Sequence, residues 1–251
     1  MDNLYRKNHE NFALIWIGIY CLVQSLANGL SAKIGVPKSA NAVLALIQSG
    51  YLLWWLRKNG LTKQFRLNFP TQSAGKMLFY LPLLLISTSN LWLGLRMALT
   101  PAALGIHILL MLAVGFLEEL IFRGFLFEAL REKSLKTAVL VSSLTFGVGH
   151  LVNFFNGSGM SFGEVLFQIV FAALFGFLFV MVYLRSGSLI PCILSHQAVN
   201  ILSAFANRQA SRQAHFIVNA MEVTVVLFYL AVLIRMPSAG AAENTRCDRA
   251  E

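Results

Sequence analysis

Residues 102–127 read AALGIHILLMLAVGFLEELIFRGFLF, an apolar stretch whose only charged residues are Glu118, Glu119 and Arg123. About 20 apolar residues cross the hydrocarbon of a bilayer as an α-helix. A helix that is apolar on nearly every side suits a membrane better than the surface of a soluble domain. The stretch therefore predicts a transmembrane helix that carries ionisable groups.

The composition of the whole chain agrees with this class. Of its 251 residues, 57% are hydrophobic and 12% are charged, whereas a soluble domain carries about 25% charged residues. We expect an all-α, polytopic transmembrane helix bundle of about eight spans, with a single domain over residues 1–235 and a disordered cytoplasmic tail over 236–251. The expected spans are Phe12–Ala32, Ala40–Leu56, Met77–Leu95, Ala102–Phe127, Thr137–Phe155, Val165–Leu184, Leu189–Phe205 and Phe216–Ile234.

The net charge of +9 is a topology signal, because the basic residues gather on one side of the expected spans. The positive-inside rule makes that side cytoplasmic. It therefore predicts a multi-pass protein of a bacterial cytoplasmic membrane with both termini in the cytoplasm, and a lipid bilayer but no nucleic acid as partner. The inner set is Arg6, Lys7, Arg57, Lys58, Lys63, Arg66, Lys76, Arg131, Lys133, Lys136, Arg185, Arg235, Arg246 and Arg249, and the outer set is Lys33, Lys38, Arg96, Arg208 and Arg212.

The ionisable groups inside the spans are the candidates for function, because such groups are costly in lipid. Glu119 and Arg123 are four residues apart with the glutamate first, the favourable order for an ion pair on a helix. Glu118 points about 100° away from that pair on the helix. We therefore expect Glu118 to lack a counter-ion and to be available as a general base.

Two further spans carry a histidine. Phe146 and His150 form an FxxxH motif, with Gly147 and Gly149 beside it where another backbone could come close. His196 and Asn200 are four apart and share a helix face. His107 lies about 16 Å from Glu118 along the helix at 1.5 Å per residue, so we interpret it as a packing residue.

The three motifs EExxxR, FxxxH and HxxxN occur in this order, each on its own span. In this the chain resembles the CAAX prenyl protease and bacteriocin-processing family of intramembrane proteases, also called the ABI family, over a core of about 102–205. The resemblance implies peptide-bond hydrolysis in a membrane cavity open to the cytoplasm, on a peptide or membrane-protein substrate that is prenylated or bears a leader. Glu118 and His150 would activate the water, His196 and Asn200 would stabilise the oxyanion, and Glu119, Arg123 and Phe146 would support the site.

Metal dependence is open at this point, since the family is often described as metalloproteases. The zinc helix HExxH is absent, and we favour a glutamate mechanism without a metal cofactor. The alternative is zinc held by Glu118, His150 and His196, an acceptable set of ligands.

Two other functions compete with proteolysis. An ion-coupled transporter would use buried Glu, Arg and His as a relay and would give Glu222 a role, but the chain shows no inverted repeat. A non-proteolytic immunity or scaffold protein of the same family is the second alternative. An aspartyl protease is excluded because the only aspartates, Asp2 and Asp248, lie outside the spans.

Overall fold

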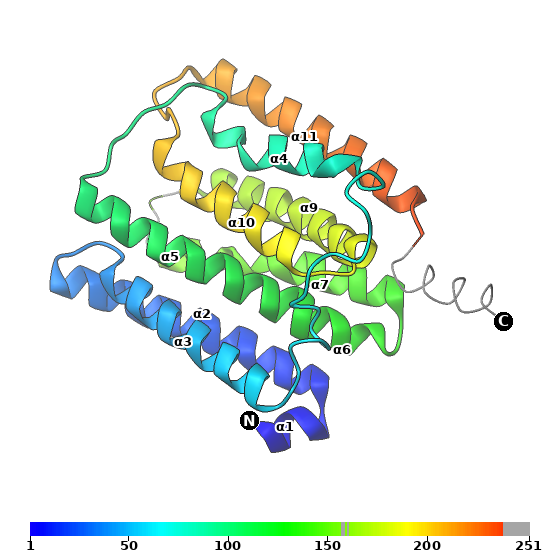
Figure 1. The fold of residues 1–251 in the computed structure, drawn as a ribbon. Helices are drawn as coiled ribbons and strands as arrows, with labels where there is room; N and C mark the ends of the chain where they lie inside the picture. Colours follow the sequence, from blue (N-terminus) through cyan, green and yellow to red (C-terminus); the bar gives the residue numbers. More distant parts are fainter. Residues whose placement is uncertain (157–158, 160, 238–251) are drawn as a thin grey trace.

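The computed structural model describes residues 1–251 except 157, 158, 160 and 238–251, so most of the expected tail lies outside the described residues. The described chain is a bundle of helices without β-strands, and its helices run side by side (Figure 1). The longer helices are α2 (His9–Ile34), α3 (Ser39–Lys58), α5 (Pro101–Glu119), α7 (Leu135–Gly149), α9 (Phe162–Ser186), α10 (Ile190–Leu202) and α11 (Arg212–Arg235). The short ones are α1 (Asp2–Lys7), η1 (Leu78–Tyr80), α4 (Leu81–Ser87), η2 (Ser89–Leu91), η3 (Leu120–Phe127), α6 (Glu128–Arg131), α8 (Leu151–Phe155) and η4 (Ser203–Phe205).

Five of the expected spans correspond to helices that are long and apolar enough to cross a membrane within the described residues. They are His9–Ile34, Pro101–Arg131, Leu135–Phe155, Phe162–Ser186 and Arg212–Arg235. Helix α3 does not meet that standard of length and hydropathy, and Ile190–Phe205 is apolar but shorter. The structure thus supports a multi-pass helical protein with five such helices rather than the expected eight.

The expected span Met77–Leu95 is wrong as a single helix. Leu78 and Tyr80 have φ angles of 51° and 56°, a left-handed conformation that interrupts a right-handed helix. Pro82 then stands in the first turn of α4, where a proline is tolerated, and does not kink a longer helix. The segment packs against α10 and α11 as short pieces, and the Ser87 and Ser195 hydroxyls are 2.7 Å apart there.

Hydroxyl caps set where the long helices start. Thr100, Ser134, Ser161 and Ser211 each accept a hydrogen bond from a backbone N–H three residues further on, which satisfies one of the free donors of the first turn. Because the rise along a helix is constant, the residue at which a helix starts determines how far along the bundle its motif residues lie. The helix that carries Glu118 continues to Arg131, as needed to bring Glu118 level with His150.

The two ends of the bundle differ in charge. One end of the bundle carries Arg57, Lys63, Arg131, Arg185 and Arg235, and we call it the basic end. Helix α2 begins there, and helices α3, α6, α9 and α11 terminate there. The other end holds the α2–α3 turn and the starts of α5 and α11. The first residues of the chain and the end of α11 lie at the same end of the bundle in Figure 1, as expected for termini on one side of the membrane.

Helices α7 and α9 approach closely at Gly147. A Cβ atom at this position would lie 2.7 Å from the Ile169 carbonyl oxygen and 2.8 Å from the Ala173 Cβ atom. At Gly149 in the same helix the nearest atom would be 3.8 Å away, an ordinary contact. Of the two glycines beside His150, only Gly147 therefore serves the packing of neighbouring helices.

We expect Gly147→Ala to destabilise the protein by about 1–3 kcal/mol, because the methyl group overpacks the contact with backbone atoms of α9. Gly149→Ala is the matched control and is expected to be neutral or slightly stabilising, since alanine favours a helix over glycine. Thermal unfolding of the purified variants in detergent measures both. Equal melting temperatures for the two variants would contradict the role of Gly147.

Candidate functional site

His196 joins the two glutamates of α5. Its Nδ1 atom is 2.8 Å from Glu119 Oε1, and its Nε2 atom is 3.5 Å from Glu118 Oε2. Because a carboxylate only accepts, Nδ1–H donates to Glu119. The contact of Nε2 with Glu118 is then attractive only when one of these two atoms carries a proton. His196 therefore lies between the two glutamates and contacts both.

Glu119 and Arg123 form the expected ion pair, with 3.1 Å between Arg123 Nη1 and Glu119 Oε1, and both side chains are fully buried. The contact is ionic rather than a directed hydrogen bond, since no Arg123 nitrogen has a hydrogen-bond partner among the described residues. The guanidinium instead lies over the Phe146 ring, 4.2 Å from its centroid, a favourable cation–π arrangement. The pair therefore fixes Glu119, and through it His196.

A π-helical stretch follows the glutamates directly. Residues 120–127 form η3, where the wider turn departs from the α-helix of α5. Such stretches are rare and occur often at functional sites. The sequence periodicity carries no sign of it, because all eight residues of the stretch are buried and no polar face marks the helix period.

Glu118 is not without partners, contrary to the expectation from the sequence. The Tyr20 hydroxyl of α2 donates to Glu118 Oε1 over 2.6 Å, in addition to the His196 contact. The sequence reasoning missed Tyr20, because it assigned nothing diagnostic to the first span. A signal was present, since Tyr20, Gln24 and Asn28 are spaced by four and form a polar stripe on an apolar helix.

His150 presents a free ring nitrogen to the site. Its Nδ1 atom is 3.0 Å from the Phe146 carbonyl oxygen, which can only accept, so Nδ1–H donates and Nε2 keeps a lone pair in the neutral ring. The Phe146 ring packs edge-on against both His150 and His196. Phe146 therefore lies among the three charged or titratable side chains Arg123, His150 and His196, as expected for a supporting residue.

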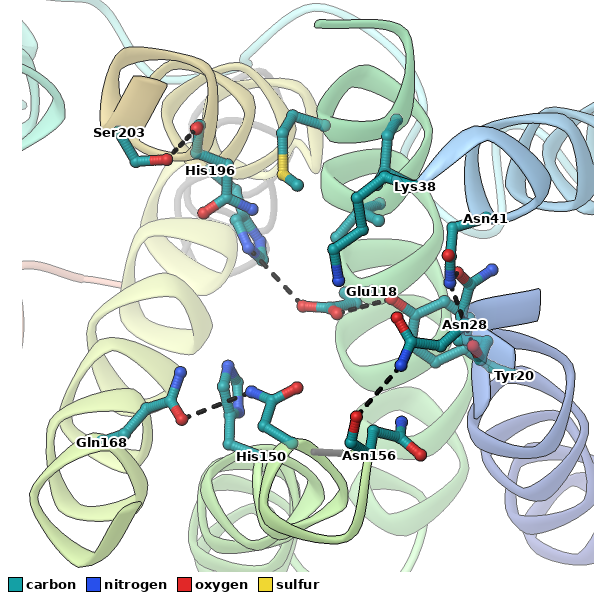
Figure 2. Close-up of a pocket in the computed structure, with 16 residues that line it drawn as sticks. Tyr20, Asn28, Lys38, Asn41, Glu118, His150, Asn156, Gln168, His196 and Ser203 are labelled. Atoms are coloured by element: carbon teal, nitrogen blue, oxygen red, sulfur yellow. Dashed lines mark hydrogen bonds and ion pairs between the residues drawn. The ribbon is translucent and has the colours of Figure 1, made fainter. Parts of the chain in front are cut away.

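The side chains of Glu118, His150 and His196 face one cavity of about 620 Å³. Figure 2 shows Glu118, His150 and His196 on three sides of it, with Tyr20 beside Glu118. The remaining lining is rich in amides and includes one amine. It consists of Gln24, Asn28, Lys38, Asn41, Leu110, Met111, Val114, Asn153, Asn156, Gln168, Asn200 and Ser203. The motif residues Glu118, His150, His196 and Asn200 are thus brought together, and α2 and α3 complete the wall.

A second, smaller pocket adjoins the histidines on their other side. It measures about 170 Å³ and is lined by His150, His196 and aromatic side chains of α9, Phe171, Phe175 and Phe179. A cavity of about 150 Å³ with apolar walls holds one benzene-sized group. The two histidines therefore separate a large polar cavity from a pocket that fits one apolar side chain.

Polar contacts hold α10 against α5 at the level of the site. His107 Nε2 is 3.0 Å from the Asn200 carbonyl oxygen, and the Gln197 amide donates to the Leu112 carbonyl. Gly115 permits this approach, because a Cβ there would lie 2.6 Å from Gln197 Cγ. His107 is thus a packing residue, as expected, and its bond fixes the helix that carries His196 and Asn200.

Glu222 lies away from the cavity. It is buried on α11, near the Ser89 side chain of η2. It does not line the cavity that Glu118 and the histidines share. The structure therefore gives Glu222 the role of a helix partner rather than a member of the site.

Zinc held by Glu118, His150 and His196 was the alternative to a glutamate mechanism. Within the described residues, no group of three or more His, Cys, Asp or Glu side chains lies together as a metal ion requires. His196 uses Nδ1 for Glu119, and His150 uses Nδ1 for a backbone carbonyl. These hydrogen bonds leave both Nε2 atoms available and therefore do not decide between a zinc mechanism and a glutamate mechanism.

The cavity extends toward the end of the bundle opposite the basic end. Lys38 begins α3, Asn28 lies in the last turns of α2, and Asn156 closes α8, all at that end. The sequence led us to expect cytoplasmic termini and a cavity open to the cytoplasm. The start of the chain lies at the basic end, and these three lining residues lie at the other.

A family model described as type II CAAX prenyl endopeptidase, Rce1-like, matches residues 100–202. The matched segment contains all three motifs and nearly the whole core of about 102–205, which agrees with the resemblance drawn from the sequence. No curated protein and no solved structure matches the chain.

Proposed function

From the match of residues 100–202 to the type II CAAX prenyl endopeptidases, we propose that this multi-pass membrane protein is an intramembrane endopeptidase. The observation that carries the proposal is the cavity on which Glu118, His150 and His196 converge inside the helix bundle. Hydrolysis of an amide needs a base beside a water molecule and donors where negative charge develops. The convergent side chains supply both.

The hydrogen bonds support the following roles for these residues. Glu118 and the free Nε2 atom of His150 hold a water molecule, and Glu118 takes its proton as the oxygen attacks the substrate carbonyl carbon. The tetrahedral oxyanion receives hydrogen bonds from Asn200 and from His196 when its Nε2 carries a proton. As the carbon–nitrogen bond breaks, Glu118 returns the proton to the leaving amine. Glu119 and Arg123 keep His196 in place throughout.

The shape of the site favours a membrane-associated peptide as substrate. The amide-rich wall offers donors and acceptors to an extended peptide backbone. The aromatic pocket beside the histidines accepts one large apolar side chain next to the scissile bond. A prenylated tail and a peptide with an apolar leader both satisfy these requirements.

The direct test is cleavage of a peptide library by the purified protein in lipid nanodiscs, read by mass spectrometry. We expect cleavage next to a large apolar residue and no loss of activity when a chelator removes divalent metal ions. No cleavage of any peptide would contradict the proposal and favour a non-proteolytic protein. Inactivation by the chelator, with recovery on adding zinc, would overturn the metal-independent mechanism alone.

We further propose that the cavity opens on the side of the membrane opposite the cytoplasm. Basic residues predominate at the basic end of the bundle, and the cavity extends toward the opposite end. The positive-inside rule makes the basic end cytoplasmic. On this proposal the cavity does not open to the cytoplasm, in contrast to the expectation from the sequence. Substrates would enter from the outer side of the membrane.

Single cysteines report this orientation in a cysteine-free background. Lys33→Cys lies at the end toward which the cavity extends, and Lys63→Cys lies at the basic end. In intact cells, a membrane-impermeant maleimide is expected to label Lys33→Cys and to label Lys63→Cys only after permeabilisation. The reverse pattern would place the cavity on the cytoplasmic side and the termini outside.

A further inference from the structure

Lys38 stands at the entrance of the catalytic cavity in an unusual backbone conformation. It precedes α3 with a φ angle of 63°, in the left-handed region that a lysine rarely adopts. Strained conformations of this kind concentrate at functional sites and persist only where the surrounding structure enforces them. Figure 2 shows the Lys38 side chain reaching from the α2–α3 turn into the cavity.

The Lys38 ammonium group has no carboxylate within 4.0 Å among the described residues. In Figure 2 its amine end points from the turn toward Glu118, and the lining residues Asn28, Asn41 and Asn156 are neutral. The only carboxylate in that lining is Glu118, which is engaged with Tyr20 and His196. The cavity thus offers one cation in an otherwise neutral entrance.

We infer that Lys38 binds a carboxylate of the peptide substrate, which orients the chain with this group toward the entrance and the scissile bond at Glu118. The inference rests on the proposed function. A lysine in a partly enclosed site forms a charge-assisted hydrogen bond with a carboxylate, stronger than a bond between neutral groups. The carboxylate comes either from the C-terminus of the substrate or from an acidic side chain near it.

Binding to an inactive protein tests this without requiring cleavage. Glu118→Gln protein in nanodiscs is mixed with equal amounts of one peptide library in two forms, with a free C-terminal carboxylate and with a C-terminal amide. Bound peptides are quantified by mass spectrometry. If the C-terminus is the source, we expect the carboxylate form to be enriched at least about fivefold, since charge-assisted bonds contribute that much or more. If an acidic side chain is the source, peptides with Asp or Glu are enriched in both forms.

Lys38→Met, added to the Glu118→Gln protein, is expected to abolish whichever enrichment is found, and Lys38→Arg is expected to keep it. Lys33→Met is the matched control, because Lys33 is exposed at the same end and does not line the cavity. No enrichment by either source, or an equal loss in Lys33→Met, would overturn the inference. Cleavage by the unsubstituted protein decides the proposed function separately.

Discussion

Glu118→Gln is expected to abolish peptide cleavage, with a loss of kcat of about 10²–10⁴-fold, the usual contribution of a general base. Glutamine has nearly the shape of glutamate and can still accept the Tyr20 hydroxyl, but it cannot take a proton from water. Initial rates on the best-cleaved library peptide measure the effect. The melting temperature should stay within a few degrees of the unsubstituted protein, which separates lost chemistry from lost structure.

Tyr20→Phe is a milder change at the same site than Glu118→Gln. It removes one hydrogen bond to Glu118 and leaves the carboxylate in place, so we expect a smaller loss of kcat, about tenfold for a bond to a charged group. Cleavage by Glu118→Gln at the unsubstituted rate would exclude Glu118 as the base. Equal losses in both variants would show that Tyr20 takes part in the chemistry directly.

The second large effect concerns stability. Glu119→Leu leaves the Arg123 guanidinium fully buried without its counter-ion, and only the Phe146 and Phe179 rings then face the charge. Removing one member of a buried ion pair costs about 3–5 kcal/mol. For a chain of this size we expect the melting temperature to fall by about 10 °C or more. Thermal unfolding in detergent measures the change.

A double variant separates the charge from the space that the side chain fills. Glu119→Leu combined with Arg123→Met removes both charges, and replacement of a whole buried pair by apolar residues is often neutral for stability. Its melting temperature should recover while its activity stays low, because His196 has lost Glu119. Glu132→Gln is the surface control, since its contact with His9 is largely exposed and contributes about 0–1 kcal/mol. A double variant as unstable as Glu119→Leu would contradict the charge argument.

Local rules predicted the parts of the site that lie on one helix. The spacing of Glu119 and Arg123 predicted their ion pair, and the spacing of His196 and Asn200 predicted the shared helix face with which both line the cavity. Both of these depend on residues three or four apart, whose relative positions an α-helix determines by itself.

Rules for residues on one helix could not predict the contacts between different helices. Glu118 was expected to lack partners, yet Tyr20 lies 98 positions before it and His196 lies 78 positions after it in the chain. The sequence likewise contained no sign that residues 120–127 form a π-helical stretch or that Tyr80 interrupts the third expected span. Such features depend on which helix faces which, and periodicity shows only that a face is apolar.

The sequence by itself determined that this is a membrane-spanning helical protein, because its scarcity of charge leaves a bilayer as the fitting solvent. It also determined the residues of the three motifs. The tertiary structure alone decided that His196 bridges the glutamates, that α2 and α3 wall the cavity, and toward which end it extends. The physical reason is that lateral packing of helices selects these neighbours, and no periodicity within one helix encodes them.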